Sequence, residues 1–305
     1  MNVPANSQSH QIVEESGSQQ AFDLDWREAL ETGDPRWFSY PAKEPMTQTE
    51  IFELVKARRI EELLAAKAIT AERILELGCG AAGMSIFLAN KGFEVWAVDI
   101  SMNALRVAQA NATLHGSADH LNLIRGDIFC LPFSEGGFDV VMSYGLLEHF
   151  GETSLPQLLD EALRLLKPGG LFLADIVPGP SRLSIRTLGI VLSFIGSVVY
   201  HLAKREKRKV NQLYSAYFEH LYENSFDDKA WTRILTQAGL HSVTVEVCRP
   251  FPPLAITGKL ERVYVTLMQA AMPLWHSFDG RNTWLSRRWG WMYLAHGTQA
   301  PSRPG

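Results

Sequence analysis

Short apolar runs alternate with helical patterns through the middle of the chain. Two segments, 102–115 and 155–166, repeat apolar residues at the spacing of an amphipathic helix. Five runs are typical of buried strands: 73–77, 93–98, 121–125, 138–143 and 171–177. Strands that alternate with helices indicate parallel pairing and right-handed crossovers. We therefore expect an α/β fold with helices on both faces of a mostly parallel sheet.

The flanks of this region add further elements. Residues 49–66 place apolar side chains on one helical face. Aromatic residues and prolines crowd 21–50, which suits either an arm folded over a ligand site or a segment docked on the domain. Residues 1–20 are polar and rich in Ser, Gln and Asn, so we expect a disordered tail without a signal segment.

An apolar insert follows the fifth expected strand, over about 178–224. Its stretch 187–203 is slightly short of the ~20 apolar residues that span a bilayer, and 204–209 is strongly basic. A single crossing would also separate strands of one sheet. The insert therefore suits a lid over an apolar pocket or a contact with an anionic membrane. A packed extra helix with a solvated basic end is the alternative.

Beyond the insert, the pattern predicts a helix at 227–238, a strand at 240–247 and a final strand at 289–296. A second apolar stretch, 263–275, precedes that last strand. Two apolar helices beside a ligand face favour a hydrophobic acceptor. We expect a loose tail from 299 to 305.

Bulk properties narrow the classes of function. The net charge of −4 and the pI near 6.2 give no general attraction to nucleic acid. The three cysteines are scattered, which indicates neither a metal site nor a disulfide framework. A cytoplasmic location is therefore the expectation, with membrane association open through the insert.

The segment from Arg73 to Gly83 carries the candidate chemistry. An apolar strand ends in Gly78, Gly80 and Gly83, spaced G-x-G-x-x-G, and a helical pattern follows. Glycines at such a turn allow close approach of the backbone to a ligand. The same spacing is typical of nicotinamide dinucleotide sites, so it does not identify the cofactor alone.

Glu76, two residues before the first glycine, favours one cofactor over another. A pyrophosphate placed there would meet a like charge, whereas a cationic ligand would be stabilised. S-adenosylmethionine carries an ammonium and a sulfonium but no phosphate. The alternative is a surface acid beside an ordinary strand-to-helix turn.

Polar side chains also end the next three expected strands. Asp99, Asp127 and Tyr144 lie at or just after the ends of these strands. Ligands bind beyond the carboxyl ends of strands in such sheets, and an acid in the place of Asp99 suits the hydroxyls of a ribose. For Asp127, a turn residue after Gly126 is the alternative.

Several ordered motifs resemble one family. They are Glu76–Gly83, Val98–Ser101, Gly126–Ile128 followed by Leu131–Phe133, Phe138–Val141, Leu147–Phe150 and Leu166–Gly170. Residues 73–177 resemble class I S-adenosylmethionine-dependent methyltransferases, nearest the branch of ubiquinone, menaquinone and small-molecule methyltransferases. The resemblance implies a seven-stranded Rossmann-like sheet, with the last strand antiparallel.

The family also implies roles for individual residues. The loop of Gly78, Cys79, Gly80 and Gly83 would pass under the methionine part, and Glu76 would place its amino group. Asp99 would bind the ribose, Ile100 would lie against adenine, Asp127 would accept from the adenine amino group, and Ile128 would donate a backbone N–H. Tyr144 and Gly145 would form the wall beside the methionine.

His149 is the tentative catalytic residue. It follows the fourth expected strand, near the methyl group in this family, and its unperturbed pKa of about 6.5 suits a general base. Methyl transfer from a sulfonium needs little beyond alignment of the reactants, so His149 with only a packing role is the alternative.

These observations predict a tail (1–20), an arm and helix (21–70), a methyltransferase domain (71–298) with the insert 178–224, and a loose tail. The expected activity is methyl transfer from S-adenosylmethionine to a small, lipophilic acceptor, with no nucleic-acid partner and no metal. The alternatives are an inactive cofactor-binding scaffold and, third, an NAD-dependent oxidoreductase.

Overall fold

The computed structural model describes residues 22–33, 40–66, 73–116, 119–176, 226–249, 258–277 and 281–300, together with scattered positions among 191–202 and at 254 and 256. The tail 1–20, most of the insert 178–224 and residues 301–305 lie outside the described residues. A helix over 22–32 opens the described chain. The elements that follow are α2 (Gln48–Ala66), β1 (Arg73–Leu77), α3 (Gly83–Ala89), β2 (Glu94–Asp99), α4 (Met102–His115), β3 (Leu121–Arg125), β4 (Phe138–Tyr144), η2 (Leu147–His149), α5 (Ser154–Leu165), β5 (Leu166–Ile176), α8 (Asp228–Gln237), β6 (Leu240–Arg249), α9 (Lys259–Ser277), α10 (Trp284–Trp289) and β7 (Met292–Gln299).

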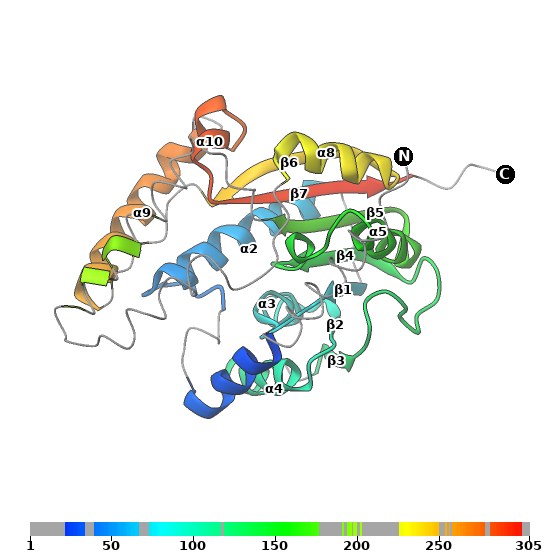
Figure 1. Ribbon diagram of the computed structural model, residues 1–305, viewed down its shortest axis with the longest axis horizontal. Helices are drawn as coiled ribbons and strands as arrows, with labels where there is room; N and C mark the ends of the chain where they lie inside the picture. Colours follow the sequence, from blue (N-terminus) through cyan, green and yellow to red (C-terminus); the bar gives the residue numbers. More distant parts are fainter. Residues whose placement is uncertain are drawn as a thin grey trace.

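The strands form one seven-stranded sheet in the order β3-β2-β1-β4-β5-β7-β6. β1 to β5 pair in parallel, whereas β7 is antiparallel to both β5 and β6. The expected mostly parallel sheet with an antiparallel last strand is confirmed. Because β7 lies antiparallel to β5, its first residue lies at the edge where β5 ends (Figure 1).

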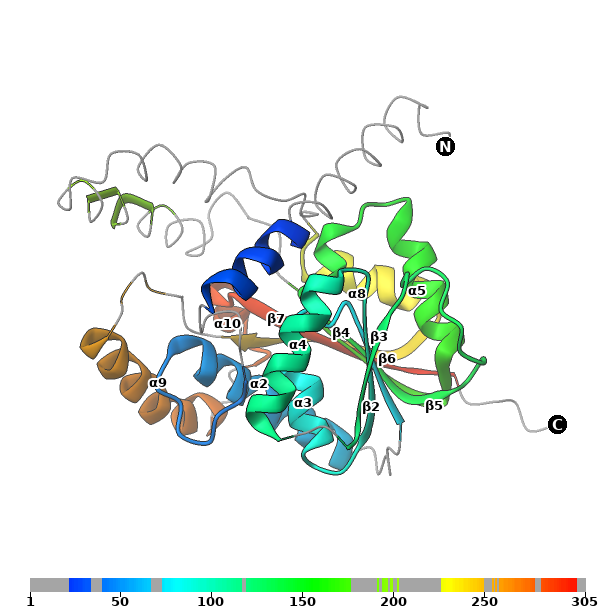
Figure 2. The ribbon, with the colours of Figure 1, turned by 90° about the horizontal axis from the view of Figure 1, so that it is seen from below.

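Alternating side chains divide the core into two layers. On one face, Leu75, Val141 and Phe172 pack with α5 and α8, whose Trp231 is fully buried. On the other face, Ile74 and Met142 pack with α2 and α3. Figure 2 shows α5 on one side of the sheet and α3 and α4 on the other. This alternation aims Glu76, Tyr144 and Asp175 at the α2 and α3 side, since each is two residues from a side chain of that face.

Three expected boundaries are wrong. The final strand begins at Met292 and not at Trp289, because Thr283 caps the short helix α10 that contains Trp289. Its end at Gln299 pairs with Leu240, so the loose tail cannot begin at residue 299. Strand β5 begins at Leu166 and not at the expected residue 171, and the β4–β5 register shifts within this added part.

Helix α2 is tied to the sheet by charged side chains as well as by apolar packing. Lys56 contacts Asp175 of β5, and Arg59 contacts Glu246 of β6. Helix α9 packs on α2 through Val265 and Met268. Among the described helices, none is both long and apolar enough to cross a membrane.

Candidate active site

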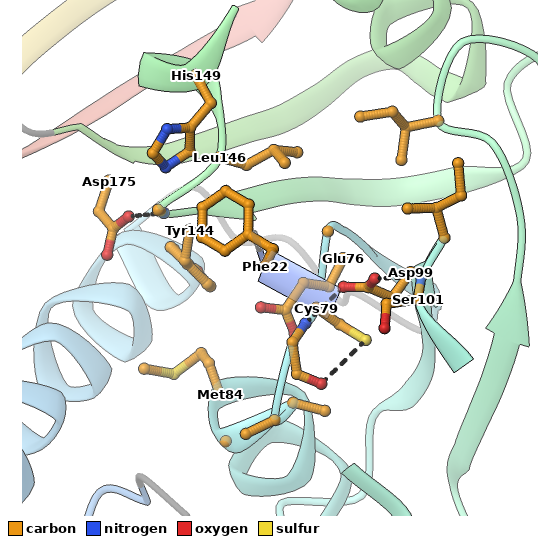
Figure 3. Close-up of a pocket in the computed structure, with 18 of the residues that line it drawn as sticks. Phe22, Glu76, Cys79, Met84, Asp99, Ser101, Tyr144, Leu146, His149 and Asp175 are labelled. Atoms are coloured by element: carbon orange, nitrogen blue, oxygen red, sulfur yellow. Dashed lines mark hydrogen bonds between the residues drawn. The ribbon is translucent and has the colours of Figure 1, made fainter. Parts of the chain in front are cut away.

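A cavity of about 610 Å³ lies at the carboxyl edge of the parallel strands. It receives residues from β1, β2, β4, β5 and the loop after β3, and the N-terminal helix and α2 complete its walls. All twelve residues expected at the site line it: Glu76, Gly78, Cys79, Gly80, Gly83, Asp99, Ile100, Asp127, Ile128, Tyr144, Gly145 and His149. Figure 3 shows His149 and Tyr144 on one side of the cavity and Glu76, Cys79, Asp99 and Ser101 on the other.

The glycine loop turns sharply between β1 and α3. Gly78 and Gly80 have φ angles of +67° and +51°, which residues with a Cβ rarely adopt. A Cβ on Gly80 would lie 2.7 Å from Cζ2 of Trp26, and one on Gly78 would lie 2.7 Å from Cδ1 of Leu146. The absence of a Cβ at these two positions therefore makes room for the side chains of Trp26 and Leu146, which close the site.

Glu76 lies at the floor of the cavity and is 3% exposed. Burial raises the pKa of its carboxyl to about 8, although a hydrogen bond from Ser85 Oγ and the charge of Lys56 act in the opposite direction. A carboxyl group that titrates near neutral pH gains most from a ligand that brings a positive charge. Glu76 is thus a buried member of the site, and the interpretation as a surface acid is wrong.

Asp99 ends β2 and organises the loop across from it. Its Oδ2 accepts from the backbone N–H of Gly80 at 2.9 Å, and its Oδ1 accepts from that of Ser101 at 2.9 Å. Burial raises its pKa, while these backbone donors lower it. Each carboxylate oxygen retains a second lone pair, so Asp99 can hold the loop and still accept from a diol.

The loop after β3 supplies the outer end of the cavity. Asp127 Oδ1 accepts from the backbone N–H of Phe129 at 3.0 Å, which is a local turn bond. Asp127 nevertheless lines the cavity together with Ile100 and Ile128. The turn interpretation of Asp127 is confirmed by this bond, which uses only one of its two oxygens.

Tyr144, Gly145 and His149 form the opposite wall. Gly145 has a φ of +63°, and its N–H donates to Asp175 Oδ1 at 2.5 Å. The ring of His149 makes an edge contact with that of Phe22, with centroids 4.9 Å apart. The segment after β4 is thus held from beneath by β5 and from above by the N-terminal helix.

Sequence reasoning missed a buried ion cluster beneath this wall. Lys56 Nζ lies 2.8 Å from Asp175 and 3.1 Å from Glu53, and it stands 4.6 Å from the centre of the Tyr144 ring. Burial alone would lower the pKa of Lys56, but the two carboxylates outweigh it and raise that pKa. Glu53, Lys56 and the buried Ile60 occupy positions i, i+3 and i+7 of α2. Residues at this spacing share one helical face, so Glu53 and Lys56 lie on the inward face with Ile60.

The N-terminal helix covers the cavity. Phe22 and Trp26 line it, and Ala29 is fully buried against Ala81 and Val107. Ser101 Oγ donates to Asp23 at 2.6 Å, which ties the helix to the end of β2. The two interpretations of this segment therefore combine, since it is docked on the domain and it also folds over the ligand cavity.

The charges of the cavity suit a cationic ligand. Among the described residues that line it, five carry carboxyl groups and one is a lysine: Glu53, Glu76, Asp99, Asp127 and Asp175 against Lys56. A pyrophosphate would meet mainly like charge in such a cavity. The donor set thus fits S-adenosylmethionine, with an acid for the ammonium and a second acid for the ribose, better than it fits a dinucleotide.

Comparisons with known proteins agree with the expected fold and family. Residues 74–170 match a family described as a methyltransferase domain. Demethylmenaquinone methyltransferase of Clavibacter sepedonicus is 36% identical over 37% of this chain and 44% of its own length. Malonyl-[acyl-carrier protein] O-methyltransferase of Enterobacter lignolyticus is 34% identical over 32% of this chain and 36% of its own length.

The solved structure of a geranyl diphosphate methyltransferase with GPP and sinefungin has a TM-score of 0.52 at 15% identity, covering 83% of this chain and 80% of that one. This likeness concerns the fold. The chain spans half or less of the length of the curated relatives named here. The matched motifs, the strand order and the acidic cavity together place residues 74–170 in the class I S-adenosylmethionine-dependent methyltransferase family.

Proposed function

We propose that this protein transfers the methyl group of S-adenosylmethionine to a small, lipophilic acceptor. The observation that carries the proposal is the cavity at the carboxyl edge, where three successive strand ends present the acids Glu76, Asp99 and Asp127. Acids at these ends match the polar parts of one cationic nucleoside. S-adenosylmethionine, when bound, supplies an electrophilic methyl group on a sulfonium.

Each residue of the cofactor side has a distinct task in this proposal. Glu76 pairs with the amino group of the methionine part, and the loop of Gly78, Cys79, Gly80 and Gly83 supports that part. Asp99 accepts from the ribose hydroxyls. Ile100 and Ile128 hold the adenine, with a backbone N–H of Ile128 as donor, and Asp127 accepts from its amino group. Tyr144 and Gly145 close the side from which the methyl group leaves.

The acceptor would enter on the side of His149. Phe22, which contacts the ring of His149, lines the cavity together with Phe129, Phe150 and Met292, and apolar walls of this kind favour a lipophilic molecule. The relatives include proteins named for demethylmenaquinone and tocopherol, both lipophilic compounds. One relative named for a malonyl-carrier protein shows that the family name alone does not fix the acceptor.

His149 is the candidate general base. Its ring faces the same side of the cavity as Tyr144 and is held in place by Phe22 (Figure 3). In the proposed reaction the acceptor atom forms the new bond to carbon, and the carbon–sulfur electron pair stays on sulfur. His149 would take the proton that the acceptor loses. His149→Ala should then lower turnover more than it lowers cofactor affinity, and equal turnover would leave the residue with a packing role.

The test is transfer of label from methyl-labelled S-adenosylmethionine. The purified protein is incubated with a lipid extract of its host, and label is measured in the organic and aqueous phases. We expect label in the organic phase, lost in Asp99→Ala and kept in the surface variant Asp119→Ala. Label confined to a water-soluble product would contradict the lipophilic acceptor, and absence of cofactor binding would contradict the enzyme itself.

We further propose that 187–209 touches an anionic membrane. The segment combines an apolar stretch with a basic end. It lies largely outside the described residues. Deletion of 187–203 in a variant that still folds should weaken co-sedimentation with anionic vesicles or raise the acceptor KM, and no change in either would make the segment dispensable.

A further inference from the structure

Helix α9 exposes a stripe of large apolar side chains. Leu260, Val263, Leu267 and Leu274 are 67%, 58%, 62% and 63% exposed. At 100° per residue they fall within an arc of about 60° on the helix surface. Scattered exposed apolar residues are ordinary, but four aligned on one helix mark a contact surface.

The other faces of α9 pack on the protein or expose polar residues, so the stripe is not a consequence of loose packing. Val265 and Met268 are buried against Ile51 of α2. Glu261 accepts from the backbone N–H of Gln48 at 3.0 Å. Arg262, Thr266 and Gln269 lie exposed on a polar face beside the stripe. The helix thus has a face for the protein, a face for water and a third, apolar face. None of the α9 side chains that the structure describes is among the residues that line the cavity.

Further exposed apolar residues lie near the first turns of α9 and in α10. Gln48 donates to the carbonyl of Leu254 at 2.9 Å, which brings Leu254 and Met46 to the first turns of α9. Both side chains are exposed. Beyond the other end, in α10, Trp284 is 75% exposed. An exposed tryptophan is typical of the boundary between lipid and water.

The few described residues of the insert repeat the pattern. Val191, Ile195, Val199 and Leu202 are exposed at spacings of four, four and three residues, and they lie in helical segments. In Figures 1 and 2 these segments and α9 lie at the same end of the molecule. The strands β1, β2, β4 and β5 also end on that side, because they run opposite to β7. The cavity therefore lies toward this end as well.

In the sequence, charge separates the insert and the segment around α9 from the rest of the chain. Residues 178–224 contain seven basic and three acidic side chains, and 259–291 contain five basic and two acidic ones. The remaining residues hold seventeen basic and twenty-eight acidic side chains. Positive charge thus accompanies the two apolar segments in an otherwise acidic protein.

We infer that the apolar stripe of α9, with Met46, Leu254 and Trp284, docks on the interface of an anionic lipid bilayer. The bilayer accounts for apolar side chains and positive charge together, since the stripe enters the acyl boundary while basic residues meet headgroups. A second copy of the chain fits less well, because a self-complementary interface would bring like charges together. The inference rests on the proposed function only in one respect: docking on a bilayer would give the protein access to a lipophilic acceptor.

The test is flotation of the full-length protein with vesicles, without cofactor or acceptor, so that it is independent of methyl transfer. Vesicles of phosphatidylcholine alone are compared with vesicles that contain about one third phosphatidylglycerol. The variant Val263→Ser/Leu267→Ser removes the centre of the stripe. The control Thr266→Ser/Gln269→Ser changes the polar face of the same helix. A change in thermal midpoint reports any loss of folding.

We expect binding to the anionic vesicles that the stripe variant weakens by about tenfold or more and the control leaves unchanged. Absence of wild-type binding to both kinds of vesicle would overturn the inference. Equal binding by the two variants would also overturn it. A wild-type dimer in light scattering that the stripe variant dissociates would assign the surface to a second copy. A stripe variant of lower stability, with a wild type that binds no vesicle, would assign it to a segment of the same chain.

Discussion

The two ends of the cavity are built in different ways. On the cofactor side, Glu76, Gly80, Asp99 and Asp127 each lie at or just after a strand end, and Asp99 bonds the backbone of both Gly80 and Ser101. On the proposed acceptor side, the walls come from distant parts of the chain: Phe22, Lys56, His149, Asp175 and Met292. Local motifs therefore define one end, and tertiary packing defines the other.

This difference follows the limits of the matched family. The residues proposed to bind the cofactor occupy short motifs within 74–170, the range matched by the methyltransferase domain. Lys56, Asp175 and Met292 lie outside that range. We expect changes on the acceptor side to affect folding or acceptor choice, and changes on the cofactor side to affect cofactor affinity.

The largest expected effect comes from removing Lys56, the lysine beneath the wall of Tyr144, Gly145 and His149. Lys56→Met leaves the buried Asp175 and the partly buried Glu53 without their cation, and loss of one partner of a buried pair such as Lys56 and Asp175 costs about 3–5 kcal/mol. We expect the free energy of unfolding, measured with urea, to fall by that amount. The control Lys91→Met breaks an exposed ion pair with Glu61 and should cost about 0–1 kcal/mol. Similar losses for the two variants would show that the buried cluster is not special.

On the cofactor side, Asp99→Ala should weaken binding of S-adenosylmethionine about tenfold or more, since the ribose loses its acceptor and the loop loses two anchors. Calorimetry measures the affinity, and the thermal midpoint reports whether the fold persists. Asp119→Ala, an exposed acid on the far edge of the sheet, is the matched control. Unchanged affinity in a folded Asp99→Ala protein would remove the ribose role.

Glu76 should make the stability depend on pH. Its folded pKa of about 8 is above the ordinary value of 4.5, so the folded state retains a proton that the unfolded chain releases. The stabilisation is therefore complete below pH 4.5 and is lost as the pH rises toward 8. In Glu76→Gln the slope of unfolding free energy against pH should be shallower over this window, by at most about 1.4 kcal/mol per pH unit. An identical slope in the variant would contradict the assignment.

The same carboxyl predicts a proton linkage for the ligand. A bound ammonium favours ionised Glu76, so binding near pH 7 should release protons. Calorimetry in two buffers of different ionisation enthalpy measures that release. It should vanish in Glu76→Gln.

The smallest effect concerns the helix over the cavity. Trp26→Ala opens space above Gly80, so the product S-adenosylhomocysteine should dissociate about three- to tenfold faster in stopped-flow measurements. Leu24→Ala, on the exposed side of the same helix, should leave that rate unchanged. If both variants behave as the wild type, the helix is a fixed wall with no influence on release.

The features that could be predicted from the sequence follow the same division. The glycine loop, the acids at strand ends and the strand order follow from patterns within a few residues, since periodicity and turn chemistry are local. The local pattern gives no reason to single out Lys56 among the polar residues of α2. Its partner Asp175 is 119 positions away, and the pairing arises only when α2 crosses the end of β5.

The direction of α9 was also beyond local reasoning. Its apolar stretch was expected to shape the acceptor pocket, yet Val265 and Met268 face α2 and four other apolar side chains face outward. A sequence states that a helix has apolar residues, whereas the neighbouring elements decide which of them are covered.

The position of β7 between β5 and β6 has a consequence for how the protein is made. In the described sheet β6 pairs with β7 alone. On the ribosome, therefore, α8 and β6 emerge well before the strand that attaches them, and β5 keeps an open edge meanwhile. The nascent domain would remain vulnerable to aggregation, and in need of chaperone protection, until residues 292–299 leave the exit tunnel.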